Sequence, residues 1–170
     1  MILTEYIVIN GARVPLPILA QNQKDAEARL QNIMTALDVR HFKSHEFAPF
    51  PEELEILIPG ILLADEIRHV FGDPVKIISG LRVPANNGGE GQSPTSQHLW
   101  GRAADLKPIN GDVQGLYAAA LVVIDGRIRG RGWSDNRRYG LGRYDTFVHV
   151  DEGSADMPGG RSQDSRWGDK

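Results

Sequence analysis

Two histidines and one aspartate carry the clearest chemical signal in the sequence. His98 and Asp105 lie in the segment SQHLWGRAAD with six residues between them, and His149 lies further along in RYDTFVHVDEG. Two imidazoles and one carboxylate provide three protein ligands, which leave the fourth position of a tetrahedral zinc ion open to water. Each residue alone is better explained as an ordinary polar surface group, and this spacing occurs by chance in many proteins. The surrounding sequence must therefore decide whether the three residues act together.

The elements expected around these residues are helices and strands in mixed order. Helical periodicity or composition predicts helices in three regions: 23–38, 51–71 and 112–125. Pro59 interrupts the second of these regions, so two short helices are expected there. Strands are expected at 75–79, 102–106, 127–133 and 144–151, and a hairpin joins 4–9 to 12–16 through Asn10-Gly11. This order favours an α+β fold with a small antiparallel sheet and flanking helices.

The other three histidines give a weaker signal. His41 and His45 are four residues apart, but their segment contains Phe, Pro and Ser and is interpreted as a loop rather than as a helix with a metal pair. His69 lies in an apolar helical stretch and is interpreted as a surface or core histidine. Residues 80–96 form a long loop ahead of His98, and loops of that length in a compact domain are usually functional or disordered.

The composition excludes several classes of function. The chain has 170 residues, a net charge of −3 and no cysteine. Thiolate zinc sites, cysteine nucleophiles and disulfides are therefore excluded, and the absence of an overall basic charge predicts no nucleic-acid partner. The N-terminus lacks the pattern of a signal peptide, and the most apolar run, residues 117–124, is too short to span a bilayer. We therefore expect a protein without a membrane segment that is cytoplasmic when made.

Three motifs occur in a fixed order around the two histidines and the aspartate. They are Ser79-Gly80-x-Arg82-x-Pro84-x-Asn86, Ser96-Gln97-His98-x-x-Gly101-x-Ala103-Ala104-Asp105 and Phe147-Val148-His149-Val150-Asp151. Together they resemble the zinc peptidase family of D-alanyl-D-alanine carboxypeptidases and phage L-alanyl-D-glutamate endolysins, in its small single-domain branch. The resemblance implies a hedgehog/D-Ala-D-Ala-peptidase-like domain over residues 41–170. Residues 1–40 would then be an N-terminal extension made of a hairpin and a helix.

The resemblance also implies roles for individual residues. By position, His98, Asp105 and His149 would bind Zn²⁺. Arg82 would face the substrate, because a guanidinium group can hold a peptide carboxylate with two hydrogen bonds; the alternative is a structural salt bridge. Ser96 is expected to hydrogen-bond the substrate.

The sequence departs from the family pattern at the expected general base. Many members carry an acidic residue three positions before the last histidine, where this chain has Thr146. On a strand over 144–151, Asp145 would share a face with His149, so we predict Asp145 as the base. Asp151 shares that face too and is expected to accept a hydrogen bond behind the metal ligands. Asp151 itself, Glu90 on the long loop, or loss of activity are the alternatives to Asp145.

Two main functions are compatible with these observations. The first is a zinc metallopeptidase, either a carboxypeptidase or an endopeptidase, that hydrolyses peptidoglycan stem peptides or cross-links with metal-activated water. It would act on the cell wall after release, or from a phage particle. The second is a non-catalytic virion or wall-binding module that retains the fold and docks through residues 1–40. A cytosolic dipeptidase of wall recycling is a third and weaker alternative.

Arginines are concentrated near the end of the chain and form a second charged feature. Six lie within a short stretch: Arg127, Arg129, Arg131, Arg137, Arg138 and Arg143. They are interpreted either as a contact surface for an anionic wall polymer or as a solvated, turn-rich hairpin.

Overall fold

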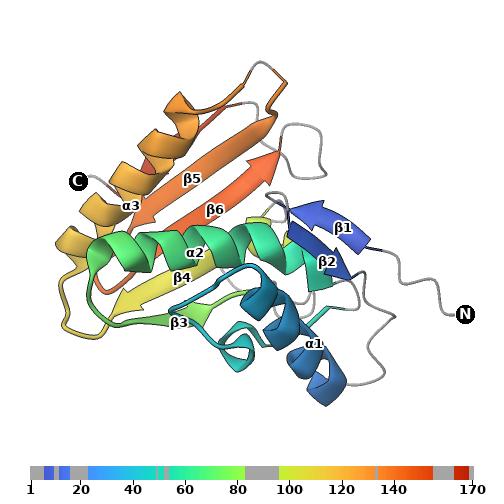
Figure 1. The fold of residues 1–170 in the computed structure, drawn as a ribbon. Coiled ribbons are helices and arrows are strands. Elements are labelled where there is room, and N and C mark those ends of the chain that lie inside the picture. The colour runs from blue at the N-terminus through green and yellow to red at the C-terminus, as the bar shows by residue number, and fades with distance from the viewer. Residues whose placement is uncertain are drawn as a thin grey trace, which may run out of the picture.

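The computed structural model describes residues 6–9, 12–15, 23–48, 50–51, 54–82, 96–132, 134–154 and 163–168. It contains three α-helices: α1 (Gln23–Ala36), α2 (Ile58–Phe71) and α3 (Val113–Arg129). The strands are β1 (Tyr6–Ile9), β2 (Ala12–Pro15), β3 (Val75–Ser79), β4 (Ala103–Pro108), β5 (Arg137–Arg143), β6 (Val148–Ser154) and β7 (Ser165–Trp167). Short 3₁₀ helices are η1 (Ser44–Phe47), η2 (Leu54–Leu57) and η4 (Gln97–Trp100). This architecture confirms the predicted α+β class (Figure 1).

The main sheet has five strands in the order β3-β4-β6-β5-β7. All neighbours are antiparallel except β5 and β7, which run parallel and make the sheet mixed. Helices α2 and α3 lie across one face of this sheet (Figure 1). Leu106, Val148 and Val150 belong to the hydrophobic core that these helices cover. Because side chains alternate along a strand, Asp105, His149 and their neighbours of the same parity point to the other face.

The ends of the helices follow from local residue chemistry. The expected two short helices of this region are η2 and α2, which meet between Leu57 and Ile58. Pro59 lies in the first turn of α2, where its missing N–H costs no hydrogen bond. The helix ends at Gly72, whose positive φ of 83° suits the left-handed cap. Asp112 caps the start of α3, because its Oδ1 accepts a hydrogen bond from the backbone N–H of Gly115 at 2.8 Å.

The prediction of a strand over 127–133 was wrong. Helix α3 continues to Arg129, because Ile128 extends the apolar face of the helix and packs against the core one turn after Ile124. The strand of this region is β5, which begins at Arg137. The expected strand over 144–151 was also wrong at its start, since β6 begins only at Val148.

The N-terminal elements are an antiparallel hairpin and a helix. Strands β1 and β2 pair with Ile9 opposite Ala12, which confirms the hairpin; Asn10-Gly11 itself lies outside the described residues. Helix α1 places Leu30 and Met34 in the same hydrophobic core as α2 and the sheet, and both are fully buried. The boundary at residue 40 stays a prediction. Within the described part of the chain, no helix combines the length and apolar character needed to cross a membrane.

Candidate metal centre

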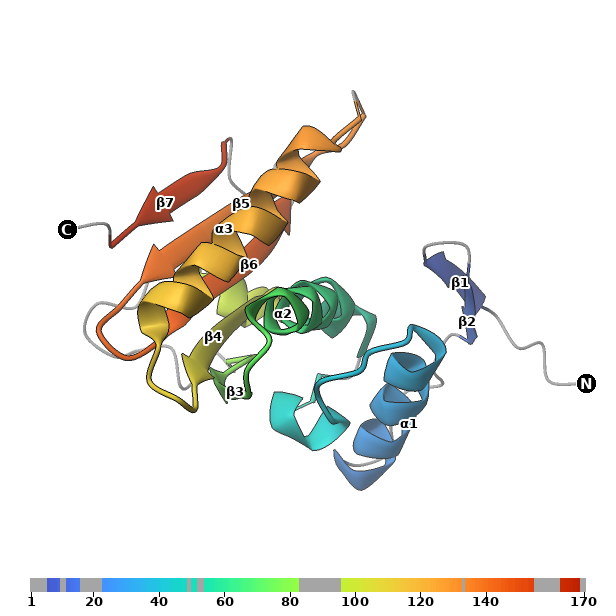
Figure 2. The same ribbon diagram turned by 60° about the vertical axis from the view of Figure 1, so that its left-hand side comes forward.

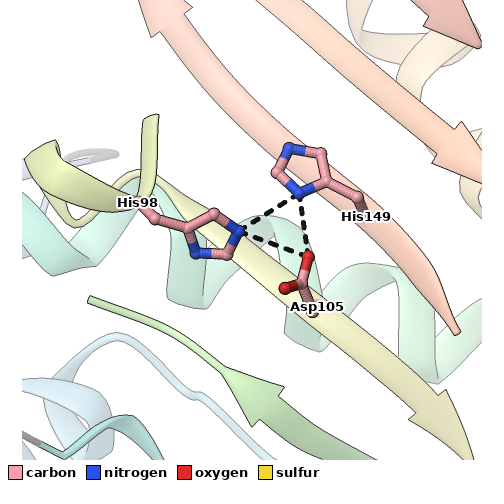
Figure 3. A group of neighbouring side chains, drawn as sticks. All are labelled: His98, Asp105 and His149. Carbon is pink, nitrogen blue, oxygen red and sulfur yellow. Dashed lines mark hydrogen bonds and ion pairs between the residues drawn. The ribbon is translucent and has the colours of Figure 1, made fainter. Parts of the chain in front are cut away.

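Side chains from three different elements meet on the face of the sheet opposite α2 and α3. His98 lies on η4, Asp105 on β4 and His149 on β6, and all three are buried (Figure 3). His98 Nε2 lies 3.2 Å from both Asp105 Oδ1 and His149 Nδ1, and His149 Nδ1 lies 2.8 Å from Asp105 Oδ1. The structure thus brings the three predicted metal ligands together.

The local fold explains this meeting. Asp105 and His149 are direct partners in the β4–β6 register, so their side chains lie side by side on one face. Ser96 caps η4 through its Oγ, which accepts a hydrogen bond from the backbone N–H of His98 at 3.4 Å. Gly101 follows η4 with a φ of +65° and turns the chain directly into β4. His98 is therefore fixed at the start of the strand that carries Asp105.

Each histidine is oriented by an acceptor on its far side. His98 Nδ1 lies 2.6 Å from the carbonyl oxygen of Gly80, and His149 Nε2 lies 3.0 Å from Asp151 Oδ2. A proton on each of these outer nitrogens donates to the acceptor and leaves the inner nitrogen with its lone pair towards the cluster. Metal-binding histidines are characteristically held in this way. Asp151 therefore takes the supporting position expected for it, and it is fully buried.

Asp105 is oriented by Arg82. The guanidinium Nη2 of Arg82 donates to Asp105 Oδ2 at 2.8 Å, while its Nε donates to Ser79 Oγ at 2.9 Å. This leaves Oδ1, the other carboxylate oxygen, directed at the two histidines. The salt bridge considered as the alternative role of Arg82 is thus present, and 26% of the Arg82 side chain stays exposed beside it.

The pKa values of Asp105 and His149 are shifted in opposite directions. Burial disfavours the charged form of Asp105, but hydrogen bonds from His149 and His98 and their positive charge outweigh it and hold its pKa well below the usual range. Burial likewise disfavours protonation of His149, yet its hydrogen bonds to Asp105 and Asp151 and their charges raise its pKa.

The donor set and spacing fit a zinc ion. Zinc bound tetrahedrally at about 2.0–2.1 Å holds neighbouring ligand atoms roughly 3.3–3.4 Å apart. The three inner atoms are separated by 2.8–3.2 Å, so a small outward adjustment accommodates the ion. Imidazole nitrogen and carboxylate oxygen are ordinary zinc ligands, and the set of three leaves a coordination position open.

Asp145, the predicted base, lies away from this cluster. It is exposed in the turn between β5 and β6, so the strand alternation that was to place it beside His149 does not apply. Among the described residues, no hydrogen bond or ion pair joins Asp145 to His98, Asp105 or His149. It lines a cavity of about 270 Å³ together with Val113, Gln114, Arg143, Tyr144 and Gly168. Glu90 lies outside the described residues.

Two contacts of the site had no counterpart in the sequence interpretation. The Gly80 carbonyl that holds His98 is a backbone group, so this contact cannot be predicted from residue types. The indole ring of Trp167 lies 5.3 Å from the His149 ring, centroid to centroid, although Trp167 is 18 residues further along the chain. In the sequence, Trp167 stood out only as a possible anchor of the tail and, with Arg166, as similar to the usual ending of the family.

Most arginines of the cluster at residues 127–143 bind acceptors within the chain. Arg127 bridges Glu66 and Glu152, each at 2.8 Å, and Arg131 pairs with Asp164 at 2.8 Å. Further internal bonds are made by three others: Arg137 to Asp135, Arg138 to the Asp135 carbonyl, and Arg143 to Gln114. These contacts favour a structural role for the arginine cluster.

The fold is of the α+β class, and its buried His98, Asp105 and His149 could hold a metal ion. A family model described as Peptidase M15 matches residues 51–151, which is more than half of the chain. The chain belongs to this family of zinc peptidases, which is D-Ala-D-Ala carboxypeptidase-like, and the resemblance noted in the sequence is confirmed. No curated protein and no solved structure matches the chain.

Proposed function

We propose that this protein is a zinc-dependent peptidase that hydrolyses peptide bonds in the stem peptides or cross-links of peptidoglycan. The observation that supports this most strongly is the convergence of His98 Nε2, His149 Nδ1 and Asp105 Oδ1 in a member of the M15 family. Outer hydrogen bonds direct all three atoms inwards, which is an arrangement expected of a metal site and not of a general polar network.

In this proposal, His98, Asp105 and His149 hold the ion, and Gly80, Arg82 and Asp151 keep the ligands in place. Zinc bound there would lower the pKa of a water molecule to about 7 and polarise the scissile carbonyl. The exposed part of Arg82 is the proposed contact for a carboxylate of the substrate, supported by its position directly beside Asp105. Ser96 is proposed to contribute a second polar contact at the same edge.

The proposed proton acceptor remains Asp145. Asp151 is engaged on the outer side of His149, away from Asp105, which argues against its use as the base. Asp145 is an exposed carboxylate on the turn that leads into the strand of His149, which is the observation that supports this choice. Replacement of Asp145 by Asn should reduce turnover strongly while leaving zinc binding unchanged.

The experiment that tests this function is mass spectrometry of purified peptidoglycan after incubation with the zinc-loaded protein. A chelator-treated sample and the His98→Ala variant serve as negative controls, and His69→Ala serves as a matched control on the surface of α2. Zinc-dependent release of D-alanine identifies a carboxypeptidase, and release of stem-peptide fragments identifies an endopeptidase. Absence of products from several wall types would contradict the proposal and favour the non-catalytic module, for which Thr146 is the first explanation.

A further inference from the structure

The last strand of the sheet ends beside the metal centre. Strand β7 lies along the outer edge of β5 and pairs with it in parallel, with Trp167 opposite Gly142 (Figure 2). Gly142 is also the direct partner of His149 in the β5–β6 register. Trp167, Gly142 and His149 therefore form one row across three neighbouring strands, from the sheet edge to the metal ligand.

The indole of Trp167 occupies the space that Gly142 leaves open. A Cβ atom at position 142 would overlap the indole Nε1 and the ring carbons next to it, so a larger residue there would displace the ring. Across this glycine, the Trp167 and His149 rings lie 5.3 Å apart at an interplanar angle of 43°. This separation is within the range in which aromatic rings attract one another. Glycine inside a strand often marks such a close approach.

Several contacts fix the indole in this position. Its Nε1–H donates to the hydroxyl of Tyr144 at 3.0 Å, and the Tyr144 ring stacks on Phe147 at 4.4 Å with an angle of 8° between the planes. The next residue, Gly168, has a φ of +86° and accepts a hydrogen bond from Arg143 Nε at 3.3 Å. Both contacts bind the end of β7 to the strand and turn that precede His149.

Contacts also hold the start of strand β7 in place. Asp164 Oδ1 accepts hydrogen bonds from Arg131 Nη2 and from the backbone N–H of Tyr139, both at 2.8 Å. Arg166 makes an ion pair with Asp125 on α3. The three residues of β7 are thus held by contacts to α3, to β5 and to the connection between them. A strand this short needs such contacts to keep one position.

We propose that Trp167 is a positioning residue for the metal centre. Its indole holds the His149 ring in the orientation that directs Nδ1 at His98 and Asp105. Gly142 has no side chain and therefore leaves space for the indole. Asp151 controls the ring through its outer nitrogen, and Trp167 restricts its rotation from the side. This inference rests on the proposed zinc centre and adds the C-terminal strand to it.

The test measures zinc affinity by competition with a chelator, together with thermal unfolding of the metal-free protein. Trp167→Ala should weaken zinc binding about 10-fold, in the range seen when a group that orients a metal ligand is lost. Trp167→Phe keeps a ring beside His149 and should restore most of this affinity. Gly142→Ala, which displaces the indole without removing it, should weaken binding in the same direction as Trp167→Ala.

Arg166→Ala is the matched control, because it loosens the neighbouring position of β7 without touching His149. It should lower thermal stability slightly and leave zinc affinity unchanged. Wild-type affinity in Trp167→Ala, or an equal loss of affinity in Arg166→Ala and Trp167→Ala, would overturn the positioning role. Failure of the wild-type protein to bind zinc would instead overturn the proposed function, so the two failures are distinguishable.

A second readout uses the tryptophan itself. Cobalt bound at the centre should quench the fluorescence of a nearby indole, and the chain has three tryptophans. Trp100 lies on η4 together with His98 and should be quenched as well, so the cobalt-dependent quenching should be smaller in Trp167→Phe than in the wild-type protein. Equal quenching in both proteins would show that the indole does not lie beside the bound metal and would contradict the inference.

Discussion

Replacement of Asp151 by Asn tests whether the buried carboxylate behind His149 prepares this ligand for the metal. Asp151 is fully buried and accepts the His149 Nε2 hydrogen at 3.0 Å. Asn has nearly the same size and keeps an acceptor oxygen, but it removes the negative charge that makes His149 a stronger ligand. Loss of such a partner typically costs 10–100-fold in metal affinity. We expect about 10-fold for Asp151→Asn, which corresponds to about 1.4 kcal/mol, and a loss nearer 100-fold for Asp151→Ala.

The assay is a zinc titration against a competing chelator, with circular dichroism to show that each variant is folded. Asp112→Asn is the matched control: Asp112 is an exposed carboxylate that also accepts a hydrogen bond, from Gly115 at the start of α3. This control should bind zinc as the wild type does. If folded Asp151→Asn binds zinc within about 2-fold of the wild type, the negative charge of Asp151 does not strengthen His149 as a ligand and the reasoning fails.

Three further predictions concern stability and are measured by denaturant or thermal unfolding. Gly101→Ala should cost about 2 kcal/mol or more, because the position has positive φ and a Cβ would lie 2.8 Å from Leu57 Cδ2; wild-type stability would contradict the turn geometry. Leu30→Ala should cost about 2–5 kcal/mol in a single transition, since α1 shares the common core; a separate early transition would show that α1 folds independently. Burial works against the charge of Asp164, but its hydrogen bonds from Arg131 and a backbone N–H lower its pKa. That contribution is present above the ordinary pKa and is lost as the pH falls through the lowered one. Asp164→Asn should therefore reduce stability by about 1 kcal/mol at neutral pH and have no effect in strongly acid solution; an equal effect at both pH values would refute the assignment.

The elements that the sequence predicted well are those whose signal is local. Strand β3 has the predicted bounds, and the hairpin of β1 and β2 follows from its Asn-Gly turn. The helical conformation of residues 127–129 was not predictable in this way. The segment is rich in arginine and glycine, and Ile128 is the apolar residue whose packing against the core continues α3. Strand β5 has the sequence RRYGLGR, whose glycines argue against a strand until β6 and β7 pair with it.

In the candidate site as well, the features with a local sequence signal were predicted and those that depend on the fold were not. Histidine and aspartate are recognisable as ligands by type, and the ordered motifs place them in one family. The orientation of these ligands depends on a carbonyl at Gly80 and on an indole at position 167, both brought in by the fold from distant positions. Asp145 shows the limit of strand periodicity, since β6 starts four residues later than expected and the argument for the direction of the Asp145 side chain is lost.

The most direct test of the metal centre is the zinc content of purified protein, measured by inductively coupled plasma mass spectrometry after dialysis. The account predicts one tightly bound zinc ion per chain in the wild type and in His69→Ala, whose histidine lies on the surface of α2. It predicts almost none in His98→Ala, because this substitution removes one of three ligands. Unchanged zinc stoichiometry in His98→Ala would contradict the assignment of the metal centre to His98, Asp105 and His149.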